Sequence, residues 1–370
     1  MNSLPKLAAA GCRLVAVWLA AALAAGGASG QENATADSAR TLLEQAYRAS
    51  HSARIEDDFS SIIELCRRAL ASGPSEHDEA YARQLTSWGH NRRGELRADA
   101  GRAEEALADF EQAVSLDATR WRAIHNRGVS YAMAGKYDQA EADFNQTIEL
   151  EPRYANAWFN RGELHFQRGQ LEPAIDDYNQ ALRLKPTDGT TLTSRGHAYW
   201  ALGNFRLAMA DLTRAIRLDP QNAPAHVYRA EALAELARFE EALDDYRRAL
   251  AIDPRFGRAY QGLAWLLAAC PDERFRNPRT ALQAATRAIE LEGDSPQFQY
   301  LDTLAACQAA AGDFNRAIEV QTRVLEQAAG QPAEVLQPLV DRLELYQQGR
   351  AYVRPALRSE PVRQPAGRDR

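Results

Sequence analysis

Residues Trp121–Pro152 read WRAIHNRGVSYAMAGKYDQAEADFNQTIELEP, and this stretch returns in altered form every 34 residues. Proline closes successive segments at this spacing, and small residues recur at fixed places inside them. The recurring residues are Pro152, Pro186, Pro220 and Pro254; Gly94, Gly128, Gly162 and Gly196; Gly101, Gly135, Gly169 and Gly203; and Ala106, Ala140, Ala174, Ala208 and Ala242. A fixed period of this size predicts one small structural unit that is stacked many times.

Each period predicts a pair of helices, as the unit Ala155–Asp188 illustrates. Apolar and small residues recur three to four residues apart in both halves of the unit, which indicates two helical faces. Gly169 lies between the halves, where a left-handed backbone is needed, and Pro186 ends the second helix because it lacks an N–H group. Gly162 and Ala174 allow the two backbones to approach closely. Such a pair cannot bury its apolar faces alone, so neighbouring pairs must stack on it.

The unit Trp121–Tyr154 resembles the tetratricopeptide repeat, which has a large residue at position 4, small at 8, aromatic at 11, Ala at 20, aromatic at 24, Ala at 27 and Pro at 32. The matching residues are Ile124, Gly128, Tyr131, Ala140, Phe144, Thr147 and Pro152. The resemblance implies an all-α fold, a right-handed superhelical solenoid of antiparallel helix pairs. Such arrays bind partners on an extended surface.

The repeat divides the chain into five expected segments. Five units keep strict register from Ser87 to Phe256, a sixth from Gly257 carries five extra residues around Cys270–Asn277, and a seventh begins near Phe298. The segments are a signal peptide (1–30), N-terminal helices with a degenerate repeat (31–86), an array of about seven repeats (87–331), a capping helix (332–350) and a disordered basic tail (351–370). A catalytic domain within 31–86 is a weak alternative, because that segment has no recognisable catalytic constellation.

The N-terminus has the pattern of a secretory signal. Lys6 and Arg13 precede the apolar run Leu14–Ala25, and small residues follow at 28–30. We therefore predict an exported protein, periplasmic or extracellular. The run is shorter than the ~20 residues that span a bilayer. The alternative is an uncleaved anchor that also includes Leu7–Cys12, which would be the only link to a membrane.

Composition and motifs exclude several function classes. The formal net charge is −6, which disfavours nucleic acid as a partner. The sequence has no Gly-rich phosphate loop and no H-E-x-x-H, G-x-S-x-G or C-x-x-C motif, so we predict no catalytic residue, metal or cofactor. Cys66, Cys270 and Cys307 are expected to be small buried hydrophobic residues, with a Cys270–Cys307 disulfide as the alternative.

Two charged positions recur with the repeat and predict internal ion pairs. Position 7 is Arg93, Arg127, Arg161, Arg195 and Arg229, and position 23 is Asp109, Asp143, Asp177, Asp211 and Asp245. Residues 7 and 23 lie side by side when the pair of helices turns near position 15, and both charges are lost together in the last two units. We therefore predict five partly buried Arg–Asp bridges, one in each unit. The alternative is that the two charges are solvated on separate faces.

The resemblance implies a concave groove lined by first-helix positions 2, 5, 9, 12 and 13. The candidate groove residues are Trp88, His125, Met133, Phe159, Glu163, Phe166, His197, Trp200, Glu231, Glu235 and Trp265. Aromatic side chains separated by acidic ones suit a peptide-binding surface. Phe166 and Trp200 could equally be core residues, because position 12 can be half-buried between helices.

These observations predict a non-catalytic protein–protein interaction module that binds a peptide or protein in the groove of the solenoid. The alternative is a structural scaffold subunit of an envelope or extracytoplasmic complex. Repetition of a fold does not by itself identify the ligand.

Overall fold

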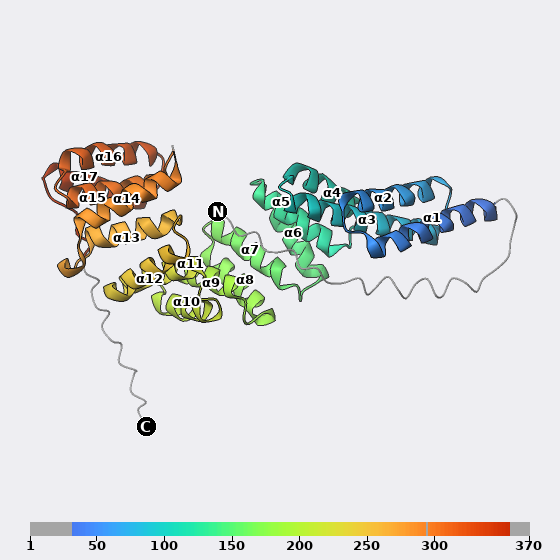
Figure 1. The fold of residues 1–370 in the computed structure, drawn as a ribbon, viewed down its shortest axis with the longest axis horizontal. Coiled ribbons are helices and arrows are strands. Elements are labelled where there is room, and N and C mark those ends of the chain that lie inside the picture. Colours follow the sequence, from blue (N-terminus) through green and yellow to red (C-terminus); the bar gives the residue numbers. More distant parts are fainter. Residues whose placement is uncertain (1–31, 294, 356–370) are drawn as a thin grey trace, which may run out of the picture. The chain divides into compact units, whose positions relative to one another are not determined.

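The computed structural model describes residues 32–355 except 294, with side chains from residue 38 onward. All regular elements in this part of the chain are helices, as Figure 1 shows. The predicted signal peptide, residues 1–30, and the tail residues 356–370 lie outside the described residues. None of the described helices is long and apolar enough to cross a membrane.

The chain divides into two compact units, Met1–Leu164 and His165–Arg370, and the boundary falls within α7. The described helices of the first unit are α1 Glu32–Ser52, α2 Glu56–Ala71, α3 Glu76–Asp99, α4 Ala103–Leu116, α5 Trp121–Met133, α6 Tyr137–Leu150 and the larger part of α7 Ala155–Gln167. Those of the second unit are the end of α7, α8 Leu171–Leu184, α9 Gly189–Ala201, α10 Phe205–Leu218, α11 Ala223–Glu235, α12 Phe239–Ile252, α13 Gly257–Ala269, the 3-10 turn η2 Glu273–Phe275, α14 Pro278–Glu292, α15 Phe298–Ala310, α16 Phe314–Gln327 and α17 Ala333–Gln347.

Both units are built in the same way, from helix pairs that stack on each other (Figure 1). In the second unit each helix from α8 to α17 packs against the next one in the chain. The first helices of successive pairs also pack together, from α9 through α11 and α13 to α15. The first unit repeats this pattern with α1, α3 and α5 as first helices. The expected all-helical stack of helix pairs is therefore present.

The core follows the small and aromatic positions of the repeat. Alanine at position 20 is buried in each regular repeat, and position 24 places a large ring or leucine against it. The position 24 residues are Phe110, Phe144, Tyr178, Leu212 and Tyr246. A Cβ atom on Gly94 would lie 2.7 Å from Cε1 of Phe110, and one on Gly196 would lie 2.7 Å from Cγ of Leu212. Glycine at position 8 therefore leaves room for the position 24 side chain in these repeats, whereas the fifth repeat has Ala230 there.

The first helix of the first regular repeat, α3, begins at Glu76, before the predicted start of the repeat register at Ser87. The Ser75 side chain caps this helix by accepting a hydrogen bond from the backbone N–H of Asp78. No proline or glycine lies between Ser75 and Ser87, so nothing ends the helix there. The N-terminal helices and the regular array therefore share α3.

In four of the five predicted Arg–Asp pairs, both residues belong to the same compact unit of the chain. In each of these four pairs the arginine donates two hydrogen bonds to the aspartate. The Arg127 guanidinium donates to Asp143 at 2.8 and 2.7 Å, and Arg195 donates to Asp211 at 2.7 and 2.8 Å. The pairs Arg93–Asp109 and Arg229–Asp245 have the same geometry. The four aspartates are buried. Arg161 belongs to the first compact unit and Asp177 to the second, although both lie in one repeat, and their pairing stays a prediction.

Two of the position 7 arginines also contact the preceding repeat, which the sequence analysis did not anticipate. Nη1 of Arg161 donates to the side-chain oxygen of Asn145 at 2.7 Å, and Nη1 of Arg195 donates to Asn179 at 2.7 Å. Asn145 and Asn179 both occupy position 25. The Nη1 donor of each of these arginines thus ties its helix to the second helix of the pair before it.

The turn between the helices of a pair needs a left-handed residue. Gly101, Gly135, Gly169 and Gly203 have φ angles between 72° and 76°, and Ala237 occupies the same place in the next repeat with φ 57°. At this turn the N–H of Arg238 donates to the carbonyl of Leu233, which closes the helix end in the same way as in the glycine repeats.

Replacing Ala237 by glycine is expected to stabilise the protein by about 1 kcal/mol. A left-handed backbone costs a non-glycine residue ~1–2 kcal/mol, and the greater freedom of glycine in the unfolded chain offsets part of the gain. The matched change Gly203→Ala should destabilise by a similar amount. Urea unfolding of both variants provides the measurement, and equal free energies for wild type and both variants would contradict the expectation.

The three described cysteines, Cys66, Cys270 and Cys307, are buried and free, so the alternative disulfide is absent. Burial raises the pKa of the Cys66 thiol to about 11 and that of Cys307 to about 12. Both side chains therefore act as small apolar groups.

Candidate functional site

The candidate groove residues of the first unit differ widely in their burial. Trp88 on α3 is half-buried, and the centre of its ring lies 5.5 Å from that of Phe59 on α2. Phe159 and Glu163 on α7 are half-buried as well. Met133, at the end of α5, is 64% exposed. Met133 is therefore the candidate of this unit with the most accessible side chain.

His125 was expected to face the groove, and this expectation is wrong. Its ring is buried beside Tyr154, with the ring centres 4.9 Å apart, and it also contacts Phe144. Asn160 on α7 donates from Nδ2 to Nε2 of His125 at 3.3 Å. Position 5 thus points between neighbouring first helices in this repeat. Burial lowers the pKa of His125 to about 3, so its ring is neutral.

The second unit brings four of the predicted residues together with two that were not predicted. We call this set the aromatic cluster: Phe166, His197, Trp200, Tyr228, Glu231 and Arg258. The His197 ring stacks on Tyr228 with centres 3.9 Å apart and an angle of 10° between the planes. The centre of the Phe166 ring lies 4.8 Å from that of His197, and the centre of the Trp200 ring lies 5.8 Å from it. The rings come from three first helices, α7, α9 and α11.

Arg258 holds the cluster together from the first turn of α13. Its guanidinium donates to the two carboxylate oxygens of Glu231 at 3.0 and 3.1 Å and to Nε2 of His197 at 3.3 Å. It also lies over the Tyr228 ring, 4.8 Å from the ring centre. This combination of an ion pair and cation–π contacts fixes the guanidinium in one plane.

The charges in the cluster follow from burial and from this ion pair. Burial, helped by the Arg258 charge, lowers the pKa of His197 to about 3, so Nε2 is free to accept a hydrogen bond. Burial alone would lower the pKa of Arg258, but the Glu231 carboxylate raises it above its usual value. The cluster therefore presents neutral rings beside one paired cation and anion.

Trp200 lies at the edge of the core of the second unit. Its ring packs against the core between α9 and α11, and its side chain remains half-buried rather than buried. Nε1 of Trp200 is shielded from water and has no hydrogen-bond partner. Phe166 is half-buried in the same manner. Trp200 thus contributes to the core, and Phe166 packs beside His197.

Tyr228 and Arg258 were missed by the sequence analysis for different reasons. Arg258 occupies position 2, which the family pattern already assigns to the groove, so the signal was present in the sequence. Tyr228 occupies position 6, which that pattern leaves out. Its stacking on His197 and its contact with Arg258 place it in the cluster.

The two remaining candidates, Glu235 and Trp265, contact the chain that follows α17. The Arg354 guanidinium forms an ion pair with the Glu235 carboxylate, and the backbone N–H of Arg354 donates to the carbonyl of Ala269 at 2.8 Å. The Tyr352 ring lies 5.8 Å from the Trp265 ring. The predicted disordered tail is therefore wrong for residues 351–354, because aromatic and charged partners on α13 and α11 hold them.

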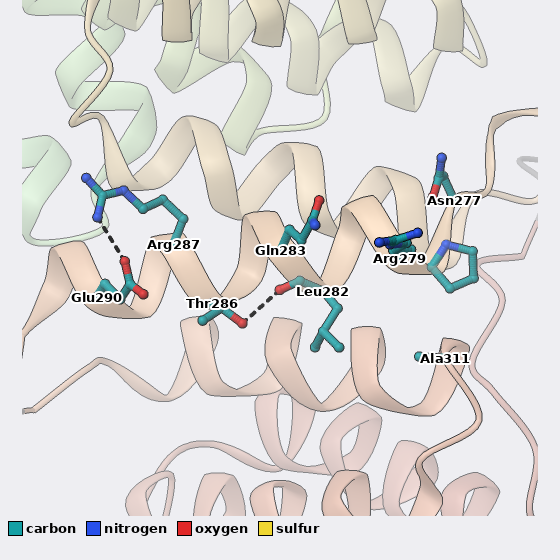
Figure 2. A pocket seen from close by; sticks show the side chains of 9 residues that line it. Asn277, Arg279, Leu282, Gln283, Thr286, Arg287, Glu290 and Ala311 are labelled. Atoms are coloured by element: carbon teal, nitrogen blue, oxygen red, sulfur yellow. Dashed lines mark hydrogen bonds and ion pairs between the residues drawn. The ribbon is translucent and has the colours of Figure 1, made fainter.

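A separate hollow is lined mostly by α14, together with Asn277 and Ala311, and Figure 2 shows its polar side chains along that helix. Arg287 pairs with Glu290 at 2.8 Å, and Thr286 donates to the carbonyl of Leu282 at 2.9 Å (Figure 2). Asn277 accepts a hydrogen bond from the backbone N–H of Thr280. These groups are bonded within their own helix end or turn and do not converge on a common point.

Clusters of three or more His, Cys, Asp or Glu side chains that could hold a metal ion are absent from the described part of the chain. His90 and His226, both at position 4, instead bond to the aspartates of the Arg–Asp pairs, at 2.8 and 2.9 Å.

Comparison with known proteins connects these features to a family. One model of the tetratricopeptide repeat matches residues 125–189 and 193–255, and a second matches residues 89–120. Such repeats are generally protein–protein interaction modules. No curated protein is similar enough to the chain to be matched.

Solved structures with the same kind of fold are similar to this chain at low identity. A tetratricopeptide repeat protein from Parabacteroides merdae is 18% identical, covers 70% of this chain and 98% of its own, and has a TM-score of 0.51. PilW, a type IV pilus biogenesis factor, is 21% identical over 60% of this chain and 98% of its own, with a TM-score of 0.49. YrrB, described as having an unusual peptide-binding site, is 20% identical over 46% of this chain and 88% of its own, with a TM-score of 0.40. Residues 89–120, 125–189 and 193–255 therefore match the tetratricopeptide repeat, and the described helices have the stacked helix-pair fold of that repeat.

Proposed function

We propose that this protein is a non-catalytic module that binds a protein or peptide on the first-helix face of its second unit. The observation that supports this most directly is the aromatic cluster around His197. Its rings come from successive first helices, and all its members are half-buried rather than fully buried. Aromatic and arginine side chains contribute most of the binding energy in many protein interfaces.

The cluster suits a partner side chain better than it suits a reaction. Arg258 and Glu231 neutralise each other through two hydrogen bonds, and His197 is neutral and bonded to Arg258. A group that is already paired is poorly prepared to transfer a proton, whereas flat rings beside a fixed ion pair can contact an extended chain. The proposed contact therefore combines ring packing with hydrogen bonds to the outer edges of the ion pair.

Site-specific crosslinking in cells tests this proposal. A photoreactive residue at Gln261, on the first-helix face of α13, is expected to capture a partner, and one at Arg247, on the outer face of α12, is not. Arg247 is exposed, so failure to crosslink there cannot result from burial. Replacing Tyr228 by serine in the Gln261 background should reduce capture at least tenfold while the helix content measured by circular dichroism is unchanged.

The scaffold alternative predicts a different pattern of crosslinks. A subunit that is surrounded by its complex would be captured from Arg247 as efficiently as from Gln261, and Tyr228→Ser would have no effect. That result would overturn groove binding and favour the scaffold.

We also propose that the protein is exported. The support is the sequence of its N-terminus, where Lys6 and Arg13 precede the apolar run Leu14–Ala25. N-terminal sequencing of the protein from cells is expected to start near Gln31, and recovery of an intact Met1 start in the cytoplasmic fraction would contradict export.

A further inference from the structure

The chain after α17 turns back over helices that precede it by more than 80 residues. Gly349, with φ 68°, ends α17, and the following residues run to Pro355 without regular structure. Ala351 and Tyr352 pack against the last core, which is formed by α15, α16 and α17. Arg354 then reaches α13 and α11 through Ala269 and Glu235. We call Ala351–Arg354 the return segment.

Three contacts hold the return segment, and each is of a kind that recognises a peptide. The Arg354 N–H donates to the carbonyl of Ala269, one of the last carbonyls of α13. The Arg354 guanidinium pairs with the Glu235 carboxylate. The Tyr352 ring lies beside Trp265, and Arg342 lies over both rings, 5.4 Å from each ring centre.

The contact at Glu235 reaches beyond what is needed to close the end of the array. The apolar end of the last core is covered by α17 together with Ala351 and Tyr352. Glu235 is the last residue of α11, two repeats before the final helix pair, and Val353 between the two anchoring residues is 41% exposed. Tyr352 and Arg354 point to the protein, and the residue between them does not, which is the alternation of an extended bound peptide.

Glu235 and Trp265 also belong to the first-helix face that carries the aromatic cluster. Glu235 lies one turn after Glu231 on α11, and Trp265 lies two turns after Arg258 on α13. The return segment therefore lies on the same two helices that present Glu231 and Arg258.

We infer that Glu235, Trp265 and the Ala269 carbonyl form a peptide-binding site that the return segment fills in the isolated protein. The partner is an extended peptide in which an aromatic residue is followed two positions later by arginine, and it displaces Tyr352 and Arg354. This inference deepens the proposed function, on which it rests. A tethered segment has an effective concentration of about millimolar, so it masks the site against weaker partners.

Fluorescence anisotropy with a labelled synthetic peptide tests the inference on the full chain. The probe is Arg-Ala-Tyr-Val-Arg-Pro-Ala-Leu, which copies residues 350–357. The double variant Tyr352→Ser, Arg354→Ser is expected to bind the probe at least tenfold more tightly than the wild type. Adding Glu235→Gln to that variant should weaken binding at least tenfold again, because the charge-assisted pair is lost. A probe with serine in place of tyrosine and of the second arginine should not bind.

Failure to bind has a clear meaning if the variant is folded. The single variant Arg354→Ser keeps the Tyr352 packing, so it serves as a second opened form if the double variant loses helix content. Absence of binding to a folded opened variant, or binding that ignores Glu235→Gln, would overturn the inference. A wild-type dimer in gel filtration that becomes a monomer in the double variant would also overturn it, since the occupant would then be a second copy of the chain.

The crosslinking experiment and the peptide-binding experiment test separate statements, so either can fail without the other. Crosslinks from Gln261 that depend on Tyr228 would support the proposed function even if the synthetic peptide did not bind. Loss of both the crosslinks and the peptide binding would remove the proposed function together with this inference.

Discussion

Replacing Arg342 by methionine is expected to lower the free energy for opening of α17 by about 3 kcal/mol. The Arg342 guanidinium donates from Nε and Nη2 to the two carboxylate oxygens of Asp302, both at 2.9 Å, and both side chains are buried. Burial raises the pKa of Asp302 even though Arg342 acts in the opposite direction. Without Arg342 the Asp302 carboxyl would keep only Gln321 as a bonding partner in this buried place. Native-state hydrogen exchange of the α17 amides gives the opening free energy.

A double-mutant cycle separates this ion pair from simple packing. Methionine retains the apolar stem of the Arg342 side chain but not its charge. Asp302→Asn removes the charge of the carboxylate while keeping an oxygen for Gln321. Asp302→Asn alone should cost about 2 kcal/mol, because it leaves the Arg342 charge unpaired. The double variant should cost clearly less than the two single changes together. Additive losses would mean that the two charges do not stabilise each other.

The Asp302–Arg342 pair also illustrates which parts of the fold the sequence can predict. The repeated Arg–Asp pairs were predicted because both residues recur at the 34-residue period and disappear together. The last repeat has lost both of those residues and uses Asp302 on α15 with Arg342 on α17 instead. Those two residues occur once each, 40 positions apart, so no periodic signal connects them. Periodicity predicts what every repeat shares, and it cannot predict how the final helix closes the end of the array.

The sequence predicted only part of the candidate site. The family positions selected His197, Trp200 and Glu231, which lie in one cluster, but they also selected His125, which is buried. A position number specifies a direction on a helix, whereas the neighbouring helix decides whether the side chain is covered. At position 5 the His125 ring fits beside Tyr154, whereas at position 9 the His197 ring stacks on Tyr228 and accepts a hydrogen bond from Arg258. The return segment was missed because its arginine-rich surroundings resembled a solvated tail.

Acidification from pH 8 to pH 5 is expected to destabilise the first unit by about 2 kcal/mol through His125 alone. Burial lowers the folded-state pKa of His125 to about 3, from an ordinary value of 6.5. Below pH 6.5 the unfolded chain takes up a proton that the folded protein cannot accept. The stabilising effect of the neutral ring is therefore complete above pH 6.5 and is lost progressively as the pH falls toward 3. Hydrogen exchange of the α5 amides at the two pH values measures it.

The variant His125→Phe separates this titration from packing. Phenylalanine keeps a ring against Tyr154 and Phe144 but cannot be protonated, and it removes the acceptor that Nε2 offers to Asn160. At pH 8 the difference between the variant and the wild type reports only the changed packing and the lost hydrogen bond. Between pH 8 and pH 5 the variant should lose about 2 kcal/mol less than the wild type. An equal loss in both proteins would mean that His125 is protonated in the folded state, and that Asn160 and the surrounding rings yield to let water reach it.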